Sequence, residues 1–276
     1  LGAPLGISDE NNALKTGYDP INRCWPDWLD LLMNRAVLPK VVLPSTIIGV
    51  LSEKLCTEFN LTFAPKIVAG TTDSIAALIA TGANKLGDAV TSLGSTLVVK
   101  LISDTPLFLP EQGIYSHRLA DKWLVGGASN TGGAVLRKYF NNKELQELSD
   151  LISLNNQVPD YYPLLCKGER FPINDPEYAP RLSPRPHNDV TFLHGLLNGI
   201  ANIEQQAYQK LQQAGASPVK SIRTVGGGAV NLVWQALRQQ HILVPFIAAE
   251  HIEAAFGSAC LAKKAISMPT YPQSST

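Results

Sequence analysis

The last third of the sequence alternates long helical patterns with short apolar runs. Alternation of this kind with short connections is typical of an α/β layer architecture, because each helix buries one apolar face against a sheet. Gly215 and Pro218 end the first of these helical patterns. The expected elements are helices over 190–214, 229–240 and 251–266 and strands over 222–225 and 242–247.

Further elements are expected nearer the N-terminus. The β-branched stretch 89–102 is interrupted by Gly94, which predicts a strand, a glycine turn and a second strand. A helix should begin at Thr72 or Asp73, either of which can cap it, because the apolar residues that follow share one face. The remaining expectations are strands over 113–120 and 122–125, a helix over 134–140, an amphipathic helical segment over 27–38 and an irregular surface segment over 161–186.

Three glycine-containing turns each follow an apolar, strand-like run. They are Gly70-Thr71-Thr72-Asp73, the segment 91–96 and Gly226-Gly227-Gly228-Ala229. Glycine lets backbone N–H groups approach oxygen anions, and a turn or a helix start concentrates those donors, so the three turns together suggest a phosphate site. Each turn taken singly is also compatible with a plain connection. None of them matches the P-loop or the dinucleotide-binding pattern.

Composition excludes several other classes of function. The formal net charge is zero, which removes the electrostatic footprint of a nucleic-acid or membrane-surface binder. No apolar run approaches the roughly 20 residues of a membrane span, and no signal-peptide pattern is visible. The cysteines are isolated, which favours reduced thiols and a cytosolic location. The histidines lack the spacing of metal ligands.

The motifs of the chain resemble those of the FGGY carbohydrate kinases, in the order that this family has them. A weaker likeness over 8–13 and 17–19 points to the ribulokinase- and xylulokinase-like ketose kinases of cyanobacteria and plants. The matching segments are 70–74 for the catalytic aspartate, 91–96 for a phosphate loop, 166–172 for the Gly-Glu-Arg-x-Pro signature, 226–235 for the adenosine site and 254–259 for the closing helix.

The resemblance implies an actin-like ATPase fold, which is ribonuclease H-like, and an ATP-dependent sugar kinase that uses Mg²⁺. The sugar would be a ketose such as D-ribulose or D-xylulose, and the enzyme would be cytoplasmic, or chloroplastic in a plant. The resemblance also assigns roles to residues. Asp73 would act as the general base and would hold Mg²⁺ through water. Gly94, Ser95 and Thr96 would bind the ATP phosphates, and Gly227, Gly228, Asn231 and Trp234 would bind adenosine.

The resemblance also implies a domain organisation. Residues 1–86 would be the remainder of the N-terminal, sugar-binding domain, 87–268 the C-terminal, ATP-binding domain and 269–276 a frayed tail. A hinge is expected near 82–87. The sequence opens without a methionine and lacks the Asp-x-Gly-Thr phosphate loop that the family carries at its N-terminus. We therefore expect a cut or processed C-terminal part of a kinase.

Other interpretations remain open at this level. The chain could be a nucleotide-binding module without kinase activity, or, less plausibly, a glycosidase that uses Asp27 and Asp30. Asp73 could be only a helix cap, and Trp234 could be a core residue. Two further segments have structural alternatives: Glu169 and Arg170 as an ion pair or loop clamp, and 126–133 as a glycine turn bordering the nucleotide cleft.

Overall fold

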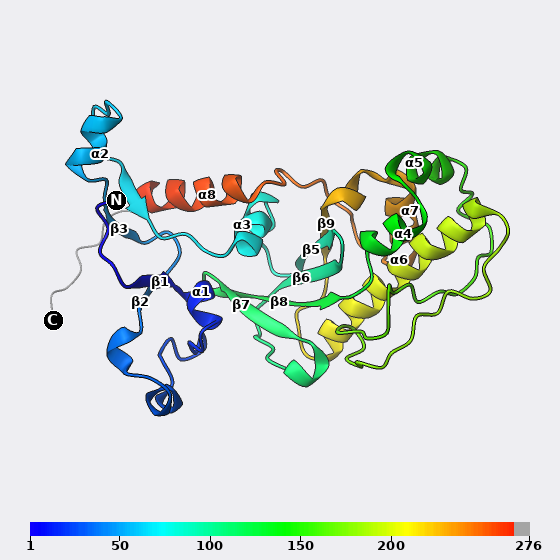
Figure 1. Ribbon diagram of the computed structural model, residues 1–276, viewed down its shortest axis with the longest axis horizontal. Coiled ribbons are helices and arrows are strands. Elements are labelled where there is room, and N and C mark those ends of the chain that lie inside the picture. The colour runs from blue at the N-terminus through cyan, green and yellow to red at the C-terminus, as the bar shows by residue number, and fades with distance from the viewer. Residues whose placement is uncertain (268–276) are drawn as a thin grey trace. The chain divides into compact units, whose positions relative to one another are not determined.

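The computed structural model describes residues 1–267, and the expected tail 269–276 lies outside these residues (Figure 1). Within the chain, two compact units are distinguished. One contains residues 1–82 together with the segment that starts at His251, and the other runs from Ala83 to Glu250. The domain bounds expected from the sequence stay a prediction.

The larger unit is built on a five-stranded sheet in the order β7-β8-β6-β5-β9. All neighbours are antiparallel except β5 and β9, which run parallel. The β-branched and apolar residues of 89–102 form β5 and β6 with the glycine turn between them, as predicted. The strands are β5 (Asp88–Leu93), β6 (Leu97–Ser103), β7 (Tyr115–Leu119), β8 (Lys122–Ser129) and β9 (Ser221–Val225).

Helix α6 (Asp189–Gln213) lies alongside this sheet and connects its two apolar cores (Figure 1). Its first half contributes residues such as Phe192 and Leu196 to a cluster that also contains Trp234. Its second half contributes Tyr208 to a cluster around strands β6 and β8. The other helices of this unit are α4 (Gly133–Tyr139), α5 (Asn142–Asp150), α7 (Leu232–His241) and the short 3-10 helices η3 (Pro110–Gln112) and η4 (Gly227–Val230).

A buried ion pair ties α6 and α7 to the sheet. Glu204 and Arg238 are at most 1% exposed, and the Arg238 Nε and Nη2 donate to the two carboxylate oxygens at 2.5 and 2.7 Å. Two further bonds join the pair to the sheet, since Arg238 Nη1 donates to Thr224 on β9 at 2.8 Å and Thr91 on β5 donates to Glu204. Buried charges persist where they are paired and hydrogen-bonded in this way. Burial, and then the Glu204 charge, raise the pKa of Tyr208, whose hydroxyl also contacts Thr91.

The smaller unit is held by the packing of two helices, α3 (Asp73–Ala80) and α8 (Ala254–Ser267) (Figure 1). Gly257 faces the backbone of Ala76 so closely that a Cβ at Gly257 would lie 1.8 Å from the Ala76 oxygen. The other elements are β1 (Ile7–Asp9) parallel to β2 (Lys40–Val42), β3 (Ile47–Val50) antiparallel to β4 (Lys66–Val68), the helices α1 (Glu10–Leu14) and α2 (Glu53–Glu58), and the 3-10 helices η1 (Asp27–Leu31) and η2 (Arg35–Val37).

Two predicted elements are wrong. Residues 27–38 form two short 3-10 turns instead of one helix, because Leu31 is 87% exposed and Asn34 caps a new turn. An apolar face that buries little does not sustain a long helix. Residues 242–247 make only an isolated parallel bridge between Phe246 and Ile222, because Pro245 has no N–H for a ladder.

The close contact between α3 and α8 gives a first prediction. Replacing Gly257 with Ala should destabilise the protein by about 1–3 kcal/mol, since the added methyl group forces the two helices apart. Ser258→Ala on the neighbouring, exposed position is the matched control. Unfolding in urea measures both variants, and equal midpoints would contradict the packing described here.

Candidate functional site

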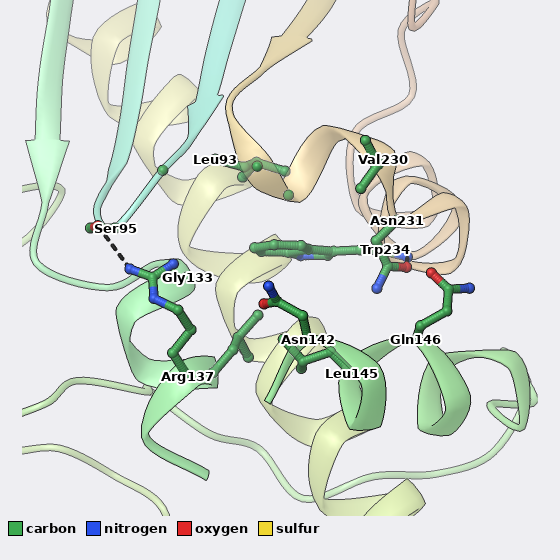
Figure 2. Close-up of a pocket in the computed structure, with 14 residues that line it drawn as sticks. Leu93, Ser95, Gly133, Arg137, Asn142, Leu145, Gln146, Val230, Asn231 and Trp234 are labelled. Atoms are coloured by element: carbon green, nitrogen blue, oxygen red, sulfur yellow. Dashed lines mark hydrogen bonds between the residues drawn. The ribbon is translucent and has the colours of Figure 1, made fainter. Parts of the chain in front are cut away.

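Strands β5 and β9 end at the same edge of the sheet because they are parallel. The glycine turn after β5 therefore lies next to the glycine turn after β9, and a cavity of about 500 Å³ opens between them and helices α4, α5 and α7 (Figure 2). The lining residues are Leu93, Gly94, Ser95, Gly133, Leu136, Arg137, Asn142, Leu145, Gln146, Gly227, Gly228, Val230, Asn231 and Trp234.

Six of the predicted site residues therefore line one cavity. They come from two segments that lie more than 130 positions apart in the sequence. They are Gly94, Ser95, Gly227, Gly228, Asn231 and Trp234. Thr96 is not among the lining residues, and Asp73 belongs to the other unit.

The turn after β5 is held by the segment that leads into α4. Gly133 N–H donates to the Gly94 oxygen at 2.9 Å, and Ala134 N–H donates to the Ser95 oxygen at 3.1 Å. Arg137 on the same helix donates through Nη2 to Ser95 Oγ at 2.8 Å, as Figure 2 shows. The turn therefore has a fixed backbone and a cation beside it, which suits an anionic ligand.

The turn after β9 leads into α7 through Asn231, whose side chain makes two hydrogen bonds within the protein. Asn231 Oδ1 accepts from Trp234 N–H at 2.9 Å, and its Nδ2 donates to Ser149 Oγ at 2.8 Å. A Cβ on Gly228 would lie 2.5 Å from the Trp234 ring, which packs directly against this glycine. Trp234 is only 2% exposed, and Figure 2 shows its ring between Leu93 and helix α5. Trp234 is therefore a core residue that exposes little of its surface to the cavity.

Two of the lining glycines have open space where a side chain would be. A Cβ on Gly227 would meet nothing within 4 Å, and one on Gly94 would meet only atoms at 3.6 and 3.9 Å. Neither has the positive φ that requires glycine, in contrast to Gly226 with φ +87°. The fold would accept a side chain at Gly94 and Gly227. Because these residues have none, a ligand can come close to the backbone at both positions.

The cavity has a polar wall that the sequence interpretation missed. Arg137 projects from α4, and Asn142 and Gln146 lie one turn apart on α5. A signal for α5 was present, because Asn141 and Glu144 form a capping box. Nothing in the sequence indicated which face of this helix would border the cavity.

Asp73 is the first residue of α3, and its side chain is exposed. Its Oδ1 accepts from the Ser74 N–H at 2.6 Å, whereas Thr72 occupies the N-cap position without a capping bond from its side chain. Asn11 Nδ2 donates to Thr71 Oγ1 at 3.1 Å and thereby braces the turn before Asp73. Within residues 1–267 no group of three or more His, Cys, Asp or Glu residues could hold a metal ion.

The structure also resolves two alternatives. Asp27 and Asp30 both pair with Arg35, at 3.0 and 2.7 Å, and the hydrogen bond from Arg35 holds the pKa of Asp30 below its usual value. An acid in a glycosidase needs the opposite shift, so this pair does not fit that reaction. Of the segment 126–133, Gly126 and Gly127 lie inside β8, and only its end forms a turn. No helix of residues 1–267 meets the length and hydrophobicity of a membrane span.

Comparison with known proteins gives curated relatives that are sugar kinases. The chain is 22% identical over 244 residues to the gluconokinase of Bacillus subtilis, which covers 81% of this chain and 47% of the relative. It is 23% identical over 225 residues to the xylulose kinase of Escherichia coli, which covers 76% and 46%. The chain therefore spans about half the length of the curated relatives it matches.

Solved structures show the same fold. A xyloylose kinase from Brucella ovis superimposes with a TM-score of 0.84 at 26% identity, over 97% of this chain and 58% of that one. Plasmodium falciparum glycerol kinase with ADP gives a TM-score of 0.80 at 16% identity, over 96% and 56%. The predicted α/β, actin-like ATPase fold is thus confirmed. Residues 89–266 match the C-terminal domain of the FGGY family of carbohydrate kinases, and the chain belongs to this family.

Proposed function

We propose that the protein acts as an ATP-dependent carbohydrate kinase that transfers the γ-phosphate of ATP to a hydroxyl of a ketose such as D-ribulose or D-xylulose. The observation that carries the proposal is the cavity between the two glycine turns at the ends of β5 and β9. Ligands of open α/β sheets bind at the carboxyl ends of their strands. The xylulose kinases among the relatives support a ketose as acceptor. The division into domains at 1–86 and 87–268 and a cytoplasmic location are part of the same proposal.

The cavity suits a nucleotide by its shape and its donors. The bare backbone at Gly94 and the hydroxyl of Ser95, with Thr96 next to them, would meet the phosphates, and Arg137 adds a positive charge beside Ser95. Gly227 and Gly228 would let adenosine lie against the backbone. Support comes from the glycerol kinase neighbour, whose structure contains ADP.

The adenosine residues would act by different means. Asn231 uses both ends of its amide within the protein, so it would shape the site by fixing the start of α7. Trp234 would support Gly228 by packing against it, since almost none of its ring surface is available to a base.

Phosphoryl transfer depends mainly on positioning and on stabilisation of charge. Asp73 would accept the proton of the attacking sugar hydroxyl, and the Ser74 N–H on Oδ1 would orient its carboxylate for this step. Mg²⁺, when bound, would neutralise charge on the phosphates, and Asp73 is the carboxylate that we propose holds it through water. The exposure of Asp73 and its place at a helix start agree with both roles.

Replacement of Asp73 tests the base. In the complete protein, Asp73→Asn should lower kcat by about 10²–10⁴-fold, because the hydroxyl loses its proton acceptor. Asp27→Asn, another exposed carboxylate of the same unit, is the control and should leave kcat unchanged. A coupled assay of ADP release measures both. If Asp73→Asn stays within about threefold of wild type, the assignment of the base is wrong.

Replacement of the adjacent glycines tests the nucleotide site. Gly227→Ala should leave the unfolding midpoint unchanged but weaken ADP binding by roughly 10-fold or more, since its methyl group enters the cavity. Gly228→Ala should instead destabilise the protein by about 1–3 kcal/mol through its clash with Trp234. Calorimetry and thermal unfolding give the two readouts. Wild-type ADP affinity in Gly227→Ala would place the nucleotide elsewhere.

A second candidate is a module that binds ATP or ADP without transferring phosphate. It is favoured by the division of the chain, because every residue that lines the cavity lies in the unit from Ala83 to Glu250, whereas Asp73 belongs to the other unit. Binding of ADP by this chain, without sugar-dependent release of ADP from the complete protein, would support it against the kinase.

A further inference from the structure

Glu169 is a buried carboxylate with no cation in contact with it in the described part of the chain. It is 2% exposed, and its oxygens accept four close hydrogen bonds. Ser129 Oγ and the Tyr162 hydroxyl donate to Oε2 at 2.5 and 3.0 Å, and the N–H groups of Asn130 and Arg170 donate to Oε1 at 2.7 and 2.8 Å. The Arg170 side chain is directed to the Ser129 oxygen instead. Of the two sequence interpretations, the loop clamp fits and the ion pair does not.

The hydrogen-bonded groups around Glu169 form a clamp. Further buried hydrogen bonds connect this clamp with the turn after β5. Ser129 Oγ donates to Glu169 and accepts from the Thr131 N–H at 3.1 Å. The Thr131 oxygen in turn accepts from the Leu97 N–H at 2.7 Å, and Thr131 Oγ1 donates to the Pro163 oxygen at 2.5 Å. Ser129, Thr131 and Leu97 are each at most 1% exposed. A chain of hydrogen bonds therefore runs from Glu169 to the first residue of β6.

The segment that follows β8 also contacts the turn after β5 directly. Directly after Thr131, Gly132 has φ +140°, and a Cβ there would lie 2.8 Å from the Ser95 oxygen. The N–H groups of Gly133 and Ala134 then donate to the carbonyl oxygens of the turn, as described above. Since 130–132 belongs to no ladder or helix, its position depends on these local bonds.

We propose that Glu169 is a positioning residue for the phosphate-binding turn Gly94–Thr96 and acts on it through Ser129 and Thr131. The inference rests on the proposed nucleotide function of the cavity. It assigns a role to the Gly-Glu-Arg-x-Pro segment, which does not itself line the cavity.

The chemistry of the carboxylate explains why glutamate suits this position. An ionised carboxylate only accepts hydrogen bonds, and all of the groups around Glu169 donate. Burial, and then the charge of Glu169, raise the pKa of Tyr162, which keeps that hydroxyl protonated as a donor. A glutamine could keep its oxygen on the two N–H groups, but its NH₂ group would then face Ser129 Oγ and the Tyr162 hydroxyl, which would have to accept instead of donate and would lose the acceptor of their own protons.

The test compares variants that each lose a side-chain hydrogen bond in the same unit. Glu169→Gln disturbs the clamp at its centre, and Ser129→Ala cuts it before Thr131 without altering charge, in case Glu169→Gln fails to fold. Tyr161→Phe is the control, because the buried Tyr161 ring stays while its hydroxyl loses a partly buried bond to the Pro184 oxygen, which is not part of the bonds that lead to the turn. Two readouts are measured on the full chain: ADP affinity by calorimetry, and hydrogen exchange without nucleotide at the amides of Leu97, Gly133 and Ala134.

We expect Ser129→Ala and Glu169→Gln to speed exchange at these three amides and to weaken ADP binding roughly 10-fold, while Tyr161→Phe changes neither. Wild-type exchange at the three amides in Ser129→Ala would overturn the proposal, as would equal effects of Tyr161→Phe. If the wild-type chain binds no ADP, the proposed nucleotide function fails for this chain. The exchange comparison then still decides whether Glu169 positions the turn.

Discussion

Strands β5 and β9 run parallel, with Asp88 opposite Ser221 and Ser92 opposite Val225, and they therefore end side by side. All other neighbours in the sheet are antiparallel, so β5 and β9 are the one pair of neighbouring strands in it whose C-terminal ends lie at the same edge. Two turns that are distant in the sequence are thereby brought to a common cavity. The position of every predicted nucleotide residue in this unit follows from that pairing.

Two buried carboxylates support the turns from different sides. Glu204 lies in the core with Arg238 and reaches β5 and β9 through Thr91 and Thr224. Glu169 contacts no cation within residues 1–267 and is stabilised by hydrogen bonds from the loop it holds. In both cases the desolvation of a charge is offset by several hydrogen-bond partners, which also restrain the surrounding backbone. A rigid frame of this kind suits a site whose chemistry is largely positioning.

The sequence predicted the regular parts of the fold because local pattern decides them. Helix α6 and the β5–β6 hairpin follow from periodicity and β-branched residues, and the glycine turns follow from composition at strand ends. One failure depends on tertiary context, because most apolar residues of 27–38 stay exposed in the folded unit. The other is local, because Pro245 has no N–H for a ladder. The burial of Trp234 and the contribution of Arg137 could not be read from spacing, because they depend on how α4 and α7 pack. The pairing of β5 with β9 is likewise non-local.

The central claim is that the cavity between the turns after β5 and β9 holds the nucleotide. A crystal structure of the protein grown with ADP and Mg²⁺ tests it most directly. The account predicts density for ADP with its phosphates against Gly94 and Ser95, and its adenosine against Gly227 and Gly228. Density for ADP at any other place, or an empty cavity at an ADP concentration that saturates binding in solution, would contradict it.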